Sequence, residues 1–220
     1  MVQPALAAVL SGCSGPLSAL DPTGPAAASI ATLWWVMVAG AAALFALVLV
    51  LFTLVIRRPG WGSRVPPARW ILFGGLVLPA VVLPPLVGYG LGAGERLLPL
   101  PSSAPVRIEA EGQQWLWTFR YPDYGRIETR NVLHLPAGIP VDIAVTSLDV
   151  IHAFWVPRLA GQIDAVPGHV TRLRIEADRP GRYEGLCNQF CGLGHPVMRF
   201  VIIVDRAQDF PGALAQAVGK

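Results

Sequence analysis

The chain has 220 residues, of which 53% are hydrophobic and only 14% are charged, and its mean hydropathy is +0.51. This much apolar surface argues against a wholly soluble protein. The net charge is +3, yet residues 103–210 contain 11 arginines against 12 acidic residues. The positive surplus lies elsewhere, in Arg57, Arg58, Arg64 and Arg69, so it indicates membrane topology and excludes a nucleic-acid partner.

Two uncharged stretches, of 35 and 25 residues, lie in the first half of the chain. Because about 20 helical residues cross a bilayer core, each stretch is long enough for a membrane helix. We expect helices at about 29–56 and 70–91, which form a hairpin over residues 26–97. Three prolines fall in the second stretch, and a membrane helix tolerates them where neighbouring groups satisfy the freed carbonyls.

The loop 57–69 between these helices is short, rich in arginine and free of acidic residues. Such loops remain in the cytoplasm, so we expect both ends of the hairpin and everything after it to lie outside. The chain is therefore expected in a bacterial inner (plasma) membrane, with its C-terminal domain in the periplasm or at the cell exterior.

Residues 1–25 form a separate segment before the hairpin. Leu10-Ser11-Gly12-Cys13 resembles a lipobox, in which cleavage leaves an acylated Cys13 at the new N-terminus. A signal peptide begins with basic residues, and residues 1–12 contain none. Acylation of Cys13 and an ordinary buried thiol both stay open.

Residues 98–210 consist of short stretches in which polar and apolar residues alternate, separated by turns with proline, glycine and aspartate. The five clearest stretches are Val106–Glu111, Gln114–Tyr121, Val141–Thr146, Val170–Ala177 and Phe200–Val204. Short strands with regular turn signals predict an all-β sandwich or barrel. Residues 211–220 are expected to be a C-terminal tail.

Five residues with metal-binding side chains gather in and before one stretch. Cys187, Cys191, His195 and Met198 follow one another at intervals of four, four and three residues, and His152 lies 35 residues before the first cysteine. Thiolate, thioether and imidazole together favour copper. Zinc would accept two Cys and two His but has little use for a methionine. A disulfide between the cysteines is the alternative in an oxidising compartment.

One copper ion would need only two histidines, one cysteine and a weak methionine, which leaves Cys187 as a surplus thiolate. Two thiolates four residues apart are used most economically when they bridge two copper ions, each of which also holds one histidine. Met198 would then be the weak ligand of one ion and a loop carbonyl, best placed at Gln189, that of the other.

These residues resemble subunit II of the haem–copper cytochrome c oxidases, and the resemblance covers nearly the whole chain. It implies a cupredoxin-like Greek-key domain on a two-helix membrane hairpin. It also implies a binuclear copper centre, termed CuA, with six ligands: His152, Cys187, the Gln189 carbonyl, Cys191, His195 and Met198. Many relatives carry a glutamate at position 189 that helps to hold magnesium at the interface with subunit I, so Gln189 weakens the case for magnesium here.

The same resemblance assigns roles to residues around the centre. It makes Trp115 the residue that accepts the electron, and it places Asp149 in the docking face for cytochrome c. Asp164 falls in a stretch that faces subunit I. Trp117 is expected to pack the core. His134 and His169 are expected to be structural or surface residues.

The function implied is that of the subunit through which electrons enter a proton-translocating cytochrome c oxidase. Cytochrome c is the donor, haem in subunit I the acceptor, and oxygen is reduced in subunit I; subunit III and membrane lipid are further partners. Quinol-oxidising relatives lack the copper ligands, all of which are present in this sequence. The alternative is a membrane-anchored periplasmic protein that delivers copper during assembly.

Overall fold

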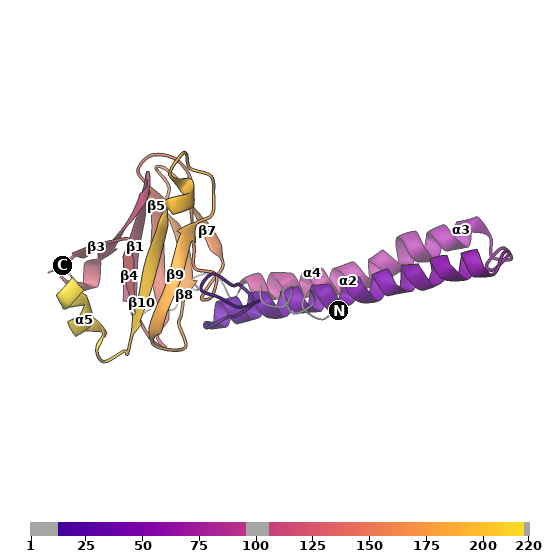
Figure 1. The fold of residues 1–220 in the computed structure, drawn as a ribbon, viewed down its shortest axis with the longest axis horizontal. Coiled ribbons are helices and arrows are strands. Elements are labelled where there is room, and N and C mark those ends of the chain that lie inside the picture. The colour runs from indigo at the N-terminus through magenta and orange to yellow at the C-terminus, as the bar shows by residue number, and fades with distance from the viewer. Residues whose placement is uncertain (1–12, 96–105, 218–220) are drawn as a thin grey trace, which may run out of the picture. The chain divides into compact units, whose positions relative to one another are not determined.

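The structure is a computed structural model that describes residues 13–95 and 106–217 (Figure 1). Within these residues the helical elements are α2 (Pro25–Arg57), α3 (Pro67–Trp70), the π-helical η2 (Ile71–Val77), α4 (Leu78–Glu95) and α5 (Phe210–Ala217), with single 3-10 turns at η3 (Pro122–Tyr124) and η4 (His195–Val197). The strands are β1 (Val106–Gln113), β2 (Leu116–Tyr121), β3 (Ile127–Arg130), β4 (Val132–Pro136), β5 (Val141–Ser147), β6 (His152–Trp155), β7 (Gln162–Ala165), β8 (Thr171–Ile175), β9 (Gly181–Cys187) and β10 (Arg199–Asp205).

The chain divides into two compact units, of which Thr32–Glu95 is one. Two helical runs, Pro25–Arg57 and Pro67–Glu95, are long and apolar enough to cross a membrane. This unit contains the first run from Thr32 on and the whole of the second. The second run stays helical through Pro84 and Pro85. The π-helical section of this run ends at Val77, directly before the turn that contains Pro79. Proline has no backbone N–H, so it removes a hydrogen bond from the regular helical pattern.

The other unit is built around a β-sandwich (Figure 1). One five-stranded sheet has the order β3-β2-β1-β5-β8 and the other the order β4-β10-β9-β6-β7. Strand β1 is parallel to β5, and β4 is parallel to β10, while the other pairs are antiparallel. The expected fold class, two apolar helices followed by an all-β sandwich, is confirmed.

Alternation along the strands explains which face each sheet buries. In β1, Val106, Ile108 and Ala110 point into the core while the charged residues between them point out, as the two-residue period of a strand requires. Inside, four aromatic rings from both sheets pack together, with centroids 5.0 to 6.4 Å apart. These rings are Trp117, Phe119, Phe154 and Phe200. Trp117 is fully buried, so the expectation that it packs the core is confirmed.

One glycine is required by this aromatic packing. Gly185 in β9 lies opposite Phe200 in β10, and a Cβ atom on Gly185 would overlap the Phe200 ring, whose Cε1 would lie only 2.7 Å away. We therefore expect Gly185→Ala to lower the free energy of unfolding by about 1–3 kcal/mol, measured by thermal or chemical unfolding of the full chain in detergent. Gly212→Ala in α5 is the matched control, because it has open space and alanine favours a helix. Equal stability of the two variants would contradict this packing argument.

The segment before the membrane helix binds to the sandwich. The Thr23 N–H donates to the Arg158 carbonyl (2.7 Å), and the Asp178 N–H donates to the Thr23 carbonyl (2.9 Å). The Arg158 guanidinium forms an ion pair with Asp21 at 2.9 Å. At Gly24 a Cβ atom would lie 2.8 Å from the Leu159 carbonyl oxygen, so the backbones meet too closely for a side chain. This contact segment, residues 21–24, is therefore an added piece of the sandwich.

Two sequence expectations differ clearly from the structure, and one lies outside the described residues. Strand β2 begins at Leu116 rather than at Gln114, because the chain turns at Gln114 and Trp115. The C-terminal tail contains the helix α5, whose Phe210 and Leu214 are buried. The lipobox-like residues 1–12 lie outside the described part of the chain, in which Cys13 itself is an exposed free thiol.

Candidate metal centre

The predicted ligands come from one end of one sheet. His152 begins β6 and Cys187 ends β9, and these strands pair so that Phe154 lies opposite Cys187. Cys191, His195 and Met198 lie in the loop from β9 to β10. The Cys187 N–H donates to the Met198 carbonyl at 2.9 Å, which closes this loop at its base.

The two cysteines form the middle of the cluster, and each has its own partners. The Cys187 sulfur lies 3.8 Å from Nδ1 of His152 and 3.2 Å from the Gln189 carbonyl oxygen. The Cys191 sulfur lies 3.6 Å from Nδ1 of His195 and 3.7 Å from the Met198 sulfur. The six predicted donor groups are thus brought together as two sets of three, one set around each sulfur.

Most of the donors are removed from water. His152 is 0% exposed, Cys187, Cys191 and Met198 are buried as well, and His195 is half-buried. Burial, followed by the charge and hydrogen bond of the Cys187 thiol, raises the pKa of Cys191 to about 12. A metal ion that binds there therefore displaces a proton that the thiol otherwise keeps at neutral pH.

The donor set fits a pair of copper ions. The two sulfurs are 3.8 Å apart and both thiols are free, so the structure contains no Cys187–Cys191 disulfide. Because a metal–thiolate bond is about 2.3 Å long, a metal ion can contact both sulfurs at this separation. His152, Cys187 and Cys191 have ligand atoms within 4.8 Å of one another. The neighbouring thioether is a soft ligand that suits copper.

Asp149 holds His152 from the side away from the sulfurs. Nε2 of His152 lies 2.8 Å from Oδ1 of Asp149. The carboxylate also accepts the N–H groups of Val150 (2.7 Å) and Gln114 (2.8 Å). Burial would raise the pKa of Asp149, but the hydrogen bonds from Gln114, His152 and Val150 outweigh it, so this pKa is lower than usual. An ionised carboxylate can only accept a hydrogen bond, so Nε2 of His152 carries the proton. The lone pair of Nδ1 in the same ring then faces the sulfur of Cys187.

This arrangement makes a testable prediction for Asp149. In Asp149→Asn one carboxylate oxygen becomes an NH₂ group, which cannot accept the N–H groups that both oxygens now accept. We expect the affinity for copper to fall about 10- to 100-fold, measured by competition with a chelator. Asp164→Asn is the matched control, because this exposed carboxylate on β7 lies outside the donor sets. Unchanged affinity in Asp149→Asn would show that the contact does not position His152.

The turn between β1 and β2 holds the cysteine loop. Nε2 of Gln114 donates to the Cys191 carbonyl at 2.8 Å, and Nε1 of Trp115 reaches the same oxygen at 3.3 Å. The Trp115 ring lies on the loop backbone, since a Cβ atom on Gly194 would overlap it. Its predicted role in electron acceptance stays a prediction, but the ring does touch a residue of the cluster.

Sequence reasoning missed Gln114 and the positioning contact of Asp149. Asp149 lies three residues before His152, and this spacing could have indicated that the two side chains interact. Nothing in the sequence indicated the contact with Gln114, which lies 35 residues away. Of the other named residues, Gln189 is exposed and offers its carbonyl, Asp164 is exposed on β7 and His169 is exposed in the following loop.

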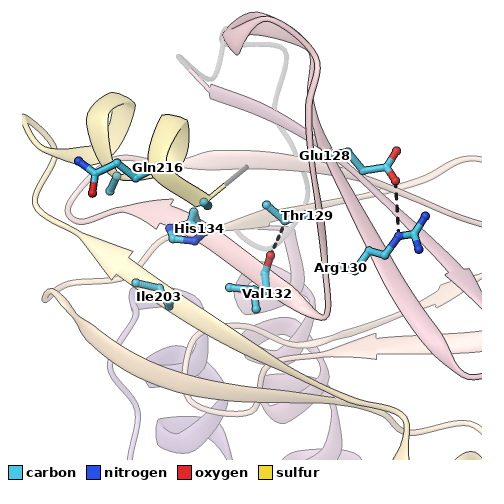
Figure 2. Close-up of a pocket in the computed structure, with 9 residues that line it drawn as sticks. Glu128, Thr129, Arg130, Val132, His134, Ile203 and Gln216 are labelled. Carbon is cyan, nitrogen blue, oxygen red and sulfur yellow. Dashed lines mark hydrogen bonds and ion pairs between the residues drawn. The ribbon is translucent and has the colours of Figure 1, made fainter. Parts of the chain in front are cut away.

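His134 has a structural contact elsewhere. It is buried in β4, and its Nδ1 lies 3.1 Å from Asp205 in β10. It also lines a cavity of about 700 Å³ between β3, β4, β10 and α5 (Figure 2). Glu128 and Arg130 lie on one side of this cavity and Gln216 on the other, and none of the predicted copper ligands lines it.

Comparison with known proteins gives a consistent result. Residues 125–205, which contain all the predicted ligands, match the family described as cytochrome c oxidase subunit II, periplasmic domain. The chain is 31% identical over 208 residues to cytochrome c oxidase subunit 2 of Alkalihalophilus pseudofirmus, covering 88% of this chain and 60% of the relative. It is 32% identical over 209 residues to quinol oxidase subunit 2 of Bacillus cereus, covering 88% and 70%.

A solved structure is similar as well. The periplasmic domain of subunit II of the cytochrome oxidase of Bradyrhizobium japonicum is 30% identical, with a TM-score of 0.51, and the match covers 54% of this chain and 96% of that domain. The chain spans 60 to 70% of the length of the two relatives above. With its apolar helices, its sandwich and these similarities, the chain belongs to the subunit II family of cytochrome c and quinol oxidases.

Proposed function

We propose that this chain is the subunit through which electrons enter a membrane-bound, proton-translocating cytochrome c oxidase. One observation carries the proposal: two free thiols 3.8 Å apart, each beside its own histidine and its own weak donor. When bound, a copper pair at this place would supply one-electron oxidation and reduction. Cytochrome c is the proposed donor, and subunits I and III are the proposed partners in a bacterial inner membrane.

The residues divide this task between them. His152, Cys187, the Gln189 carbonyl, Cys191, His195 and Met198 would hold the copper pair, with the two thiolates in the middle of the donor set. Four of these donors, His152, Cys187, Cys191 and Met198, are buried, which suits electron transfer better than binding of a substrate. The proposed acceptance of electrons at Trp115 is supported by its hydrogen bond to the Cys191 carbonyl.

The relatives include quinol oxidase subunits, so oxidation of quinol is the alternative to oxidation of cytochrome c. The donor set favours cytochrome c. A quinol-oxidising subunit has no use for two thiols, two imidazoles and a thioether that converge in a buried cluster. Delivery of copper to another protein is also disfavoured, because exchange requires accessible ligands and His152 is 0% exposed. Gln189 carries no charge with which to hold magnesium, so we propose no magnesium site.

The deciding experiment is electron paramagnetic resonance of the copper-loaded full chain in detergent. An unpaired electron shared equally by two copper nuclei gives seven hyperfine lines, whereas one copper gives four. We expect two copper ions per chain and the seven-line pattern. One copper per chain with four lines would refute the binuclear centre, and no copper would refute the proposed function as a whole.

A further inference from the structure

The loop that joins the two apolar helical runs carries positive charge that no nearby acid balances. Between Asp21 and Glu95 the chain has four arginines and no acidic residue. All four arginines are exposed, and within the described residues none of them forms an ion pair. Asp21 precedes α2 and Glu95 ends α4, so each is a whole helix away and neither carboxylate balances this charge. The four are Arg57, Arg58, Arg64 and Arg69.

An apolar groove lies beside this charge, at the end of the hairpin where α2 is joined to α3 (Figure 1). Its volume is about 790 Å³, within the range of about 300–1,000 Å³ that is usual for ligand sites. Residues of α2 spaced three, one and three apart form one wall, as positions on a single face of a helix do. They are exposed for the most part, Val48 by 60% and Phe52 by 62%. This wall consists of Val48, Leu51, Phe52 and Val55.

Two tryptophans and the loop backbone form the other wall. Trp61 and Trp70 both line the groove, and their ring centroids are 6.0 Å apart. Gly62 has a φ of +79°, and a Cβ atom there would lie 3.2 Å from the Trp70 ring, so glycine lets the loop fold onto that ring. The N–H groups of Trp61, Ser63 and Val65 each donate to the carbonyl three residues earlier, at 2.9 to 3.1 Å. These turns give the groove a defined wall.

The charge and the groove meet along the loop. Arg64 lies between Ser63 and Val65, and Arg69 directly precedes Trp70; the three neighbours all line the groove. Tryptophan is enriched at the level of the lipid headgroups, and the guanidinium fork of arginine matches a phosphate group. From the loop, the apolar wall on α2 runs about two helical turns into the membrane span. A phosphate and an acyl chain on the same molecule would match the two parts.

We propose that this groove binds one anionic phospholipid, with the phosphate at Arg64 and Arg69 and an acyl chain along the exposed face of α2. Basic residues next to a membrane helix attract anionic lipids, and each is worth about fivefold in affinity. A zwitterionic lipid gains less, because the arginines repel its ammonium group. Lipid binding at this place does not require copper, so it goes beyond the proposed function and can be tested separately.

The test is native mass spectrometry of the full chain in detergent, with phosphatidylglycerol and phosphatidylcholine that have identical acyl chains. We expect one phosphatidylglycerol to bind at least about tenfold more tightly than phosphatidylcholine. Arg64→Gln combined with Arg69→Gln should weaken the binding of phosphatidylglycerol about 10- to 30-fold and leave that of phosphatidylcholine unchanged. Arg64→Lys combined with Arg69→Lys keeps the charge that orients the hairpin, and should retain most of the affinity.

A second pair of variants tests the groove itself. Val55→Trp adds a ring to the lining wall, whereas Val50→Trp adds one to α2 outside the groove, about half a turn round the helix from Val48 and Phe52. The two valines are similarly exposed, by 53% and 56%, so the variants are matched. Only Val55→Trp should weaken the binding of phosphatidylglycerol, by several-fold, because its indole would occupy the space of the acyl chain.

Four results would overturn the lipid site. These are equal binding of the two lipids, unchanged binding of phosphatidylglycerol in the glutamine variant or in Val55→Trp, displacement of the lipid by inorganic phosphate, and loss of the other subunits from the intact oxidase in Val55→Trp but not in Val50→Trp. The last would show that a helix of another subunit fills the groove. Copper content is measured on every variant: a chain that binds the lipid but no copper would overturn the proposed function and leave the lipid site standing.

Discussion

Replacing Cys187 with serine is expected to abolish the binuclear centre. The Cys187 sulfur lies within reach of both His152 and the Gln189 carbonyl, so its loss removes one of the two thiolates that are proposed to hold the copper pair. The remaining His152, Cys191, His195 and Met198 correspond to the ligands of a single blue copper. We expect copper to fall from two ions to at most one per chain, and oxidation of cytochrome c to fall by at least about 100-fold.

The control for this variant is Gln189→Ala. Only the main-chain carbonyl of Gln189 approaches the cluster, so truncation of its side chain should leave copper content and the paramagnetic spectrum nearly unchanged. If Cys187→Ser kept two copper ions and an unaltered spectrum, the bridging role would be wrong. If Gln189→Ala lost half of the copper, the side chain would have to take part, and the carbonyl assignment would fail.

A second large effect is expected at Trp115. Trp115→Phe keeps an aromatic ring on the cysteine loop but removes the N–H that reaches the Cys191 carbonyl at 3.3 Å. That contact links the ring to the backbone of a proposed copper ligand. We therefore expect electron acceptance from cytochrome c to slow several-fold while copper content stays the same, as measured by stopped-flow reduction of the copper-loaded oxidase.

Trp117→Phe is the comparison that isolates this role. Trp117 is completely buried and its ring packs against Phe154, Phe200 and His152, so its full truncation to alanine would cost about 3–5 kcal/mol of stability. The phenylalanine variant should lower stability without slowing electron acceptance in the folded, copper-loaded protein. Equal slowing by the two variants, or none by either, would remove the special role of Trp115.

The sequence predicted the elements that repeat a simple pattern and missed those shaped by distant contacts. The membrane helices follow from uncharged length, and β1 and β5 from strict alternation. Strand β6 is only four residues long and β9 contains two glycines, so neither shows a clear alternation. They become strands because they pair with each other, and because β9 also pairs with β10 and β6 with β7.

The same distinction applies to the cluster. Cys187 ends β9, and Cys191, His195 and Met198 lie in the loop that follows it, so their chemistry could be inferred from residue type and interval alone. The environment of Asp149 could not, because its carboxylate is held by the backbone of Gln114 on another strand connection. The exposure of Leu193 and Phe190 could not be predicted either, since a leucine or phenylalanine in a sequence is ordinarily taken for core.

The contact segment at residues 21–24 requires an even number of membrane crossings between itself and the sandwich. Thr23 and Asp21 precede the first apolar helix, whereas their partners Arg158 and Asp178 follow the second. Groups that share direct hydrogen bonds must be on the same side of a lipid bilayer. If the first helix crosses the membrane, the chain is therefore obliged to cross back before the sandwich begins, whatever the charge of the intervening loop. Reversing the arginines of that loop could turn the whole hairpin over, but it could not separate the two ends without breaking these bonds.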